Sequence, residues 1–542
     1  MKLAGTDPDK LPFSTLFLHY LTGNEKIADF FDYSPFDDED ITLCAGSVPE
    51  PENRETLVEA LKTFNRDFGL HPNAIQNLER LAVPGSLTIV TGQQLTLYGG
   101  PLYTILKTLT AIRLSKHYEA LLGRAVIPVF WLADEDHDYE EAATISIPAP
   151  SGHYSTMLKD SNGHRGSVGR IKLGDDISRI SRELSEIMPD TDFSADLWEL
   201  LNACYKPENT FREAMANYLS SLFSRHGLIF AGSDDPVIKR LMVEPLARAI
   251  SDAGPLQQAL EDTSGQIEKA YHRQANVLDN TLFLHTKSGN RERLSRSNGD
   301  WHTESGEKIS SEKLLHLASV SPEVFSPNVF LRPVLQDYML PNLGYVAGPG
   351  EIAYYAQMKS FYHAFDRKMP LIIPRLSATI IEPAIERIMS GLPFELQHYQ
   401  ERIEDLEKKW LQLSEAPDAD LLFERWNNDV DALNRRYEEE VKNIEPTLTD
   451  TASKTTAEYK KSLEKLKQKL NRAIKSKQET QLKRIARIKN ELLPNGGLQE
   501  RNIAHIYFMN KYGIGIWDEL LLAMTPEAIR SHQLVYIHRS VL

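Results

Sequence analysis

The sequence predicts an α/β protein: a doubly wound core with connecting insertions, followed by a long antiparallel α-helical coiled-coil hairpin. Residues 86–141 contain an apolar β run, a Gly-rich loop, a helix that opens on Pro101, a second β run and an acidic cluster. Similar strand-to-loop-to-helix units recur at residues 227–236, 345–358 and 370–383. This alternation predicts an open parallel sheet. From about residue 395 to 492, apolar positions step by three and four, which is typical of a coiled coil.

Length and composition limit the kind of protein. At 542 residues the chain is too long for one simple core, so about two or three domains are expected. The 61 Lys and Arg residues are outnumbered by 76 Asp and Glu, and the net charge of −15 argues against a nucleic-acid partner. The two cysteines, Cys44 and Cys204, are too few for a disulfide framework or a cysteine metal site, which favours a reducing compartment.

The apolar segments indicate a cytoplasmic location. The start of the chain has no basic region followed by an apolar core, so we expect no signal peptide. No apolar run reaches the length that spans a bilayer, so we expect no membrane partner.

Residues 1–392 are expected to form the core. Residues 1–80 have amphipathic helical patterns, with a polar break at Ser34–Asn53, and residues 193–226 are again helical. One insertion is expected at about 145–330, because polar, strand-like patterns occur in two stretches, residues 144–175 and 277–320.

The antiparallel hairpin is predicted at residues 393–493. Its first apolar seam runs through Leu396, Tyr399, Ile403, Leu406, Trp410 and Leu413. A second seam at Leu422–Val441 is followed by a break at Pro446 and a returning seam at Leu463–Leu492. The charge runs between these positions are expected to be solvated flanks. Residues 494–542 begin with a proline and two glycines that end the helix, and we expect them to pack back on the core.

The loop Thr91–Gly100 is a candidate anion site. Backbone N–H groups can approach a ligand closely at three glycines, Gly92, Gly99 and Gly100. The helix from Pro101 adds the positive end of its dipole. Neutral hydrogen-bonding groups come from Thr91, Gln93, Gln94 and Thr96. The loop matches no standard nucleotide motif, and the alternative is a tight βα turn with structural glycines. Lys107, about two turns into the helix, is expected to lie too deep for a ligand.

An acidic cluster with one histidine follows the second β run. Its members are Asp134, Glu135, Asp136, His137, Asp138, Glu140 and Glu141. Such a group can bind an ammonium, hold Mg²⁺ or act as a base, and a histidine can relay protons near neutral pH. A single histidine makes a poor zinc site, so no metal is assigned. The alternative is an acidic helix N-terminus. We expect His137 to accept or orient a proton and Asp136 to bind an ammonium.

Two later segments supply further candidates. Glu351 begins a helix after a Gly-Pro-Gly turn and either binds an amine or caps that helix. Arg375 ends a late β run before Ser377, and either clamps a carboxylate or phosphate or forms a structural ion pair. Tyr354 and Tyr355 are expected to pack rather than to react.

Five long motifs occur along the chain in the order TGQQ…GGPLYTI.K, PVFWLADEDHDYEE, GPGEIAYYAQM, PRLSATIIE and LLPNGGLQERN. In this order they resemble the bacillithiol biosynthesis cysteine-adding enzyme family, over essentially the whole chain. The resemblance implies a Rossmann-like core similar to class I aminoacyl-tRNA synthetases, and a coiled coil that makes a homodimer. It also implies a cytoplasmic ligase that forms an amide bond between cysteine and the amine of glucosaminyl-malate. That reaction is the last step in the synthesis of bacillithiol, a low-molecular-weight thiol.

The resemblance also implies site residues. In the core pocket it places Thr91, Gly92, Gln93, Gln94, the segment Gly99–Lys107 with Gly100 and Tyr103, Glu135, Asp136, His137, Asp138, Glu351, Arg375 and Ser377. It implies ADP or ATP at a second pocket by the base of the coiled coil, for which the candidates are Asn495, Gln499, Arg501 and Asn502. The chain departs from the synthetase pattern, since Gly99-Gly100-Pro101 replaces HxGH and Arg375-Leu376-Ser377 replaces KMSKS. The fold likeness alone therefore does not imply that ATP activates cysteine.

Two other functions are compatible with these residues. A metal-dependent hydrolase would use the acidic cluster at 134–138 and would lose activity in chelator. A non-catalytic coiled-coil scaffold would tolerate changes in the core pocket but not loss of the hairpin. The ligase is favoured, mainly through the family resemblance.

Overall fold

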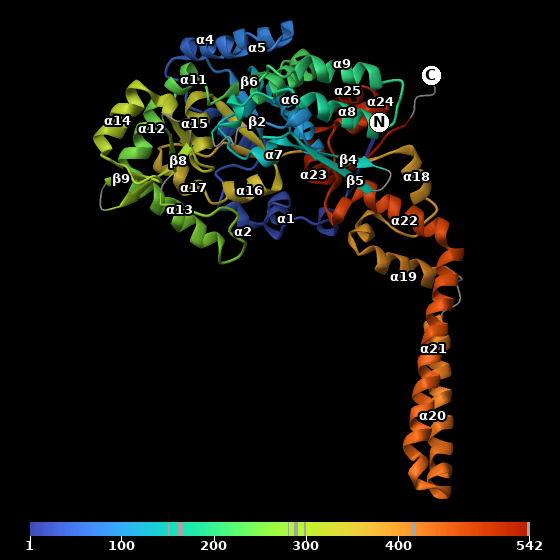
Figure 1. Ribbon diagram of the computed structural model, residues 1–542. Helices are drawn as coiled ribbons and strands as arrows, with labels where there is room; N and C mark the ends of the chain where they lie inside the picture. The colour runs from blue at the N-terminus through green and yellow to red at the C-terminus, as the bar shows by residue number, and fades with distance from the viewer. Residues whose placement is uncertain are drawn as a thin grey trace. The chain divides into compact units, whose positions relative to one another are not determined.

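A computed structural model describes residues 1–149, 152–160, 166–279, 281–286, 291–297, 300–414 and 419–538 (Figure 1). Parts of the predicted insertion at about 145–330, of the hairpin and of the segment 494–542 lie outside the described residues. The chain divides into two compact units: Met1–Pro383 with Leu498–Leu542, and Ala384–Gly497.

A five-stranded parallel sheet forms the centre of the first unit. Its strands, in spatial order, are β13 (Leu371–Pro374), β12 (Asn342–Ala347), β2 (Leu87–Gln94), β3 (Val126–Ala133) and β6 (Ile229–Gly232). Nearly every residue of these strands is buried, which explains why they read as continuous apolar runs. The chain leaves β2 toward β3 and β6 on one side and later adds β12 and β13 on the other. The strand order therefore reverses beside β2.

Helix α6 (Leu102–Leu122) connects β2 to β3 and packs on both. Gly123 ends it in the left-handed conformation, with φ of 65°. The other helices of this unit are α1 (Thr15–Leu21), α2 (Glu25–Ala28), α3 (Asp38–Ser47), α4 (Arg54–Asn65), α5 (Pro72–Leu81), α7 (Tyr139–Ala143), α8 (Ile177–Ile187), α9 (Ser194–Cys204), α10 (Phe211–Phe223), α11 (Pro236–Arg240), α12 (Val243–Ser251), α13 (Ala253–Ile267), α14 (Ser311–Val320), α15 (Leu331–Met339), α16 (Pro349–Tyr355), α17 (Lys359–Ala364), α23 (Gln499–Asn502), α24 (Ile506–Tyr512) and α25 (Ile516–Ala523).

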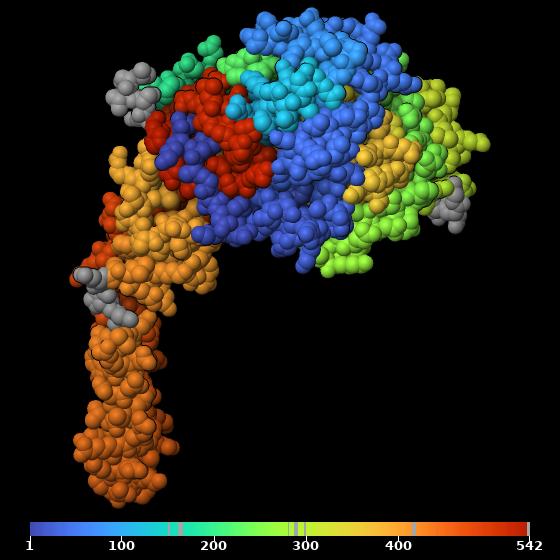
Figure 2. Space-filling model, turned by 180° about the vertical axis from the view of Figure 1, so that it is seen from behind, coloured from blue at the N-terminus to red at the C-terminus, as the bar shows by residue number. Residues whose placement is uncertain are grey.

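The N-terminal region differs from its helical prediction at two places. The predicted polar break at Ser34–Asn53 contains α3, whose first N–H groups are capped by Asp37. The chain also begins with a strand, β1 (Lys2–Thr6), which pairs with β15 (His532–Tyr536) from the opposite end of the sequence. Figure 2 shows these N-terminal and C-terminal segments side by side on one face. Because the two strands are so distant in sequence, no local sequence pattern predicts their pairing.

The late β run at residues 370–383 forms two strands rather than one. β13 belongs to the central sheet, whereas β14 (Ser377–Ile381) pairs with β15 in a three-stranded sheet of order β1-β15-β14. The chain changes sheets at Arg375 and Leu376, whose N–H groups donate to the carbonyl of Ala347 at 2.9 Å and to Thr110 Oγ1 at 2.9 Å.

The stretches expected in one insertion form separate sheets. β4 (Thr144–Ala149) and β5 (Gly152–Met157) make an antiparallel hairpin. The second sheet, in spatial order, contains β10 (Lys308–Ile309), β9 (Asp300–Thr303), β8 (Arg291–Ser297), β7 (Leu282–His285) and β11 (Phe325–Pro327). In the sequence, the hairpin and the second sheet lie on either side of β6, which belongs to the central sheet.

The second unit contains α18 (Pro383–Met389) apart from its first residue, α19 (Ile403–Leu413), α20 (Ala419–Ile444), α21 (Thr449–Lys477) and α22 (Glu479–Leu492). α20 and α21 run antiparallel, since Lys460 pairs with Asp431 at 2.5 Å while Lys467 pairs with Asp420 at 2.7 Å. The turn falls at the predicted Pro446. The predicted first seam is not one helix, because residues 396–400 form a 3₁₀ turn that ends before α19.

Candidate active site

A cavity of about 610 Å³, here called the central cavity, lies at the carboxyl ends of the parallel strands. Gln93 and Gln94 end β2, Ala133 ends β3, Ser233 follows β6 and Gly348 follows β12, and all of them line it. In open α/β sheets, ligands bind in the crevice where the strand order reverses. The central cavity occupies that position.

Many of the residues predicted to touch a ligand lie on its wall. They are Gly92, Gln93, Gln94, Tyr103, Glu135, Asp136, His137, Glu351, Arg375 and Arg501. Five predicted substrate residues do not line it: Thr91, Gly99, Gly100, Asp138 and Ser377.

Gly99 and Gly100 shape the loop rather than expose backbone to a ligand. Their φ angles are 76° and 69°, a region that favours glycine. A Cβ on Gly99 would meet Cε1 of His505 at 2.7 Å, and one on Gly100 would meet Oγ1 of Thr96 at 2.6 Å. The N–H of Gly99 donates to the hydroxyl of Tyr205 at 2.9 Å. Packed side chains therefore occupy the space that a Cβ would need at either position, and the Gly99 N–H is engaged within the protein.

Thr91, Asp138 and Ser377 also have structural partners. Oγ1 of Thr91 donates to a backbone carbonyl of β12 at 3.1 Å. Asp138 accepts a bond from the N–H of Glu141 at 3.0 Å and so caps α7, which agrees with the helix-terminus alternative at this position. Oγ of Ser377 lies 2.8 Å from Nδ1 of His532 inside the three-stranded sheet.

Lys107 and Glu351 form an ion pair at the cavity wall, with Nζ and Oε2 2.5 Å apart. Nζ of Lys107 also donates to the carbonyl of Gly92 at 2.9 Å. The expectation from its helix position that Lys107 lies too deep is wrong, since its side chain lines the cavity, where the resemblance places it. Burial lowers the pKa of Lys107, and the charge of Glu351 opposes that effect.

Glu351 both caps its helix and holds a charge at the cavity. It accepts bonds from the N–H of Gly348 at 2.7 Å and from the hydroxyl of Tyr345 at 2.8 Å. Burial alone would raise the pKa of Glu351, but Lys107 and these hydrogen bonds together hold it below its ordinary value. Glu351 is therefore ionised at neutral pH, and its negative charge is compensated within the protein.

Arg375 forms a buried ion pair. A structural ion pair is one of the two roles expected for this residue from the sequence. Its Nη2 donates to Oε1 of Glu500 at 2.7 Å, and its Nη1 donates to the carbonyl of Leu376 at 2.9 Å. Its guanidinium lies 5.7 Å from the ring centre of Tyr103 on the cavity wall. The Nε atom is buried, and no described residue accepts a hydrogen bond from it.

Two arginines that the sequence interpretation missed also reach the wall. Arg332, on α15, lies 5.4 Å from the ring centre of Tyr345. Arg291, on β8, lies 3.5 Å from the ring centre of Phe283. Among the described residues, no carboxylate forms an ion pair with either guanidinium. No local motif marks them, because each enters the cavity from an element distant in sequence from the Gly-rich loop.

The acidic cluster contributes an exposed histidine and a fixed carboxylate. The His137 side chain is 61% exposed, and its Nδ1 lies 3.2 Å from Nη1 of Arg291 and 3.6 Å from Oδ1 of Asp136. Oδ2 of Asp136 accepts a bond from Nε2 of Gln94 at 2.6 Å. The Gly-rich loop and the acidic cluster therefore meet at the cavity.

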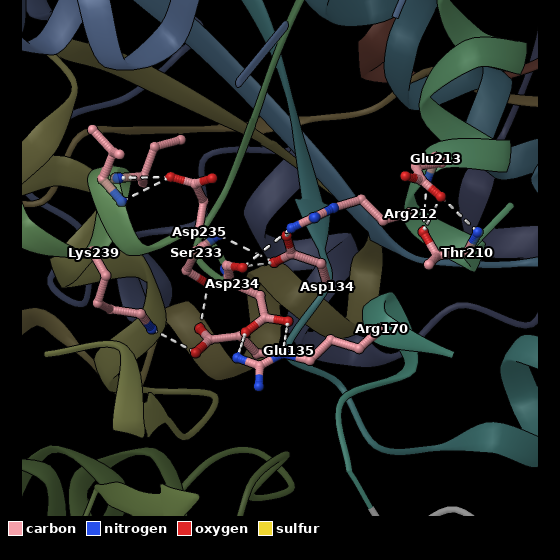
Figure 3. A network of polar contacts seen from close by, with 12 residues as sticks. Asp134, Glu135, Arg170, Thr210, Arg212, Glu213, Ser233, Asp234, Asp235 and Lys239 are labelled. Carbon is pink, nitrogen blue, oxygen red and sulfur yellow. Dashed lines mark hydrogen bonds and ion pairs between the residues drawn. The ribbon is translucent and has the colours of Figure 1, made fainter. Parts of the chain in front are cut away.

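The first two acids of the cluster belong to a buried polar network (Figure 3). Oδ1 of Asp134 accepts bonds from the N–H groups of Ser233 at 3.1 Å and Asp234 at 3.0 Å. Burial and the nearby Asp234 raise the pKa of Asp134 to about 7, and Arg212, 3.6 Å away, opposes this. Arg170 binds Asp234 through two hydrogen bonds.

Two family models together cover nearly the whole chain. The model "Bacillithiol biosynthesis BshC, N-terminal Rossmann-like domain" matches residues 2–376, and the model "Bacillithiol biosynthesis BshC, C-terminal coiled-coil domain" matches residues 378–537. The chain belongs to the bacillithiol biosynthesis BshC family. The predicted resemblance is confirmed, as is the fold class of a Rossmann-like core with a coiled coil.

Relatives with the name "Putative cysteine ligase BshC" align over most of both chains. The protein from Prosthecochloris aestuarii is 33% identical over 96% of each chain. That from Salinibacter ruber is 32% identical over 96% of each, and that from Geobacillus kaustophilus is 30% identical over 97% of this chain and 99% of its own. A solved structure described as a putative arginyl tRNA synthetase from Campylobacter jejuni is 10% identical. The match covers 86% of this chain and 98% of that one, with a TM-score of 0.24.

Three of the four candidate nucleotide residues, Gln499, Arg501 and Asn502, belong to the first unit. Asn495 lies in the second unit, with φ of 55°. Gln499 exchanges both amide hydrogen bonds with the backbone of Ile380, and Nδ2 of Asn502 donates to the carbonyl of Leu498 at 2.9 Å. Arg501 alone among them lines the central cavity.

In the part of the chain that the structure describes, no three His, Cys, Asp or Glu side chains are arranged to hold a metal ion. None of the described helices combines the length and the apolar character needed to cross a bilayer.

Proposed function

We propose that this member of the BshC family joins cysteine to the amine of glucosaminyl-malate, as a cytoplasmic homodimer, in the last step of bacillithiol biosynthesis. One observation carries the proposal: the central cavity combines guanidinium groups that lack a carboxylate partner, among the described residues, with acidic side chains. A substrate that bears carboxylates and a primary amine needs both kinds of group. The names of the relatives support the same reaction.

The guanidinium groups suit the malate part. Arg332 and Arg291 present planar donors that match carboxylate geometry, and the aromatic faces of Tyr345 and Phe283 hold them in place. Lys107 contributes less attraction, because Glu351 already compensates its charge. Arg332 is therefore our main candidate for a carboxylate of the substrate.

The acidic groups suit the amines of the two substrates. Asp136 and Glu135 lie on the wall with carboxylate oxygens that can accept N–H bonds. An amine must lose a proton before it attacks a carboxyl carbon, so a neighbouring acceptor such as His137 is useful. The alternative metal-dependent hydrolase fits less well, because Asp134 and Glu135 are engaged by Arg212 and Lys239.

A free carboxylate does not react with an amine without activation, so ATP is included in the proposal as a cosubstrate to be tested. The test uses purified full-length protein with cysteine and glucosaminyl-malate, with and without ATP, and mass spectrometry of the product. We expect a product with the mass of the two substrates less water, in the ATP arm only. Product without ATP would contradict the cosubstrate, and no product from either arm would contradict the ligase.

The Arg332→Gln variant tests the assignment of the malate part. We expect its affinity for glucosaminyl-malate to fall about tenfold or more, while its affinity for glucosamine, which has no carboxylate, stays the same. Arg293→Gln is the matched control, because Arg293 is an exposed arginine of the same unit that does not line the cavity. Equal affinities in Arg332→Gln and the control would sink the assignment.

A further inference from the structure

We propose that Lys239 is a positioning residue that holds Glu135 as an oriented carboxylate on the wall of the central cavity, where Glu135 binds the primary amine of a substrate. The inference deepens the proposed function and rests on it for the identity of the amine. Lys239 does not itself line the cavity. Its effect on a ligand therefore passes through Glu135.

Lys239 is a fully buried lysine with a specific partner. Its side chain is 0% exposed, and its Nζ lies 2.5 Å from Oε1 of Glu135. A second bond runs from Nζ to the carbonyl of Phe325 at 3.0 Å. A buried ammonium is costly unless it is paired and hydrogen-bonded, so this geometry is not a loose surface contact. Helix α11 therefore supplies the ammonium group that fixes the carboxylate of Glu135.

The second oxygen of Glu135 is held from another direction. The hydroxyl of Ser233 donates to Oε2 (Figure 3). Ser233 is itself fixed, because Asp134 accepts a bond from its N–H. An ionised carboxylate offers about four acceptor positions, and these two donors occupy two of them. Glu135 lines the cavity, so it has capacity left to accept N–H bonds from a ligand.

Several charged or titratable groups face Glu135 from the surrounding elements. Besides Lys239 they are Asp134, Arg170, His285 and Arg291. Among the described residues, Lys239 is the cation that forms an ion pair with Glu135. Without it, Oε1 of Glu135 loses its fixed donor, so the carboxylate is no longer held in one orientation toward a ligand.

The experiment compares Lys239→Met, Lys239→Arg and a control, Arg170→Gln, in the full-length protein. Arg170 belongs to the same network but binds Asp234 rather than Glu135. Binding of cysteine, glucosaminyl-malate and malate is measured by calorimetry from about pH 6 to about pH 8. Malate has no amine and reports on the rest of the cavity. Circular dichroism and thermal melting check that each variant is folded.

For Lys239→Met we expect affinity for the two amine-bearing probes to fall about tenfold or more near pH 7, because Glu135 loses the donor that orients it. Affinity for malate should stay the same, and Lys239→Arg should restore most of the loss. The inference is overturned if Lys239→Met binds the amines normally, if it loses malate equally, if Arg170→Gln has the same effect, or if the wild-type protein binds no amine.

If Lys239→Met does not fold, Ser233→Ala takes its place, because it removes one bond to Glu135 without exposing a buried charge. A loss confined to the amine-bearing probes is expected, and unchanged affinity overturns the inference. Product formation in the ligase assay is read separately. Amine-specific binding without any product would count against the ligase and leave the role of Lys239 intact.

Discussion

Nζ of Lys107 lies 2.5 Å from Oε2 of Glu351, and this ion pair joins α6 to α16 at the edge of the central cavity. Only 4% of the lysine side chain and 22% of the glutamate side chain are exposed. Removing both charges from water costs free energy, and their mutual attraction offsets this cost only while the two side chains remain paired. Substituting Lys107 or Glu351 therefore tests whether this ion pair stabilises the cavity wall.

Lys107→Met should lower the free energy of unfolding by about 3 kcal/mol, because it leaves Glu351 buried without its cation. The double variant Lys107→Met with Glu351→Gln should lose less than the sum of the two single variants, since no charge remains uncompensated. Urea unfolding of the four proteins measures this cycle. Additive losses would show that the two side chains do not stabilise each other.

A second prediction concerns His505, which lies beneath the Gly-rich loop. Its Nδ1 donates to the carbonyl of Gly100 at 2.9 Å, and its Nε2 accepts from the hydroxyl of Tyr218 at 2.7 Å. Burial lowers the pKa of His505 from 6.5 to about 4. A lowered pKa means that the neutral histidine stabilises the fold above pH 6.5 and that this stabilisation is lost as pH falls toward 4.

The free energy of unfolding should therefore fall by about 3 kcal/mol from this group between neutral and acidic pH. His505→Asn keeps a donor for Gly100 but cannot titrate in this range. The variant should be less stable at neutral pH and less sensitive to acid. Chemical unfolding over this pH range measures both. His532, whose burial also lowers its pKa to about 4, should keep part of the acid sensitivity. An unchanged pH dependence would contradict the assignment to His505.

Much of the core could be predicted because its signals are local. The strand, loop and helix of residues 86–141 lie where the apolar pattern places them, and Gln94 and Asp136 meet at the predicted cavity. What failed depended on distant partners. β1 pairs with a strand from the far end of the chain, and Arg332 reaches the cavity from a helix whose own sequence shows no motif.

Glycine in this loop is a signal with two possible causes. Positive φ and close packing against His505 require glycine at Gly99 in the same way that close approach of a ligand would. The sequence alone does not separate these two causes. Buried ion pairs raise the same difficulty, since the partner of Arg375 is Glu500, which only the folded chain brings beside it.

A third prediction concerns the homodimer that we propose for the hairpin. Leu406 is fully buried within its own unit, so its replacement would damage the hairpin rather than report on a dimer. Leu433 and Tyr437, one turn apart on α20, are 55% and 50% exposed and better candidates for a surface between two copies. Changing both to Glu should yield monomers in light scattering, whereas Arg435→Glu on the same helix should leave the dimer intact. A stable dimer of the double variant would exclude this surface.

The last prediction concerns His137, the proposed proton acceptor. Arg291 can only donate to Nδ1, so the neutral ring carries its proton on Nε2 while that contact lasts. Nδ1 must leave Arg291 before it can accept a proton from an amine. His137→Ala should therefore lower kcat by about tenfold to hundredfold with little change in KM, because exposed His137 adds little binding energy.

Higher pH should partly rescue His137→Ala, since more of the amine is then neutral without help from the protein. Arg291→Gln should weaken substrate binding but keep the histidine and hence more turnover than His137→Ala, and His316→Ala, an exposed histidine outside the cavity, serves as control. Kinetics of the reconstituted reaction across pH separate these effects. If folded His137→Ala keeps full turnover, the proton passes to another acceptor on the wall, and Asp136 becomes the group to change next.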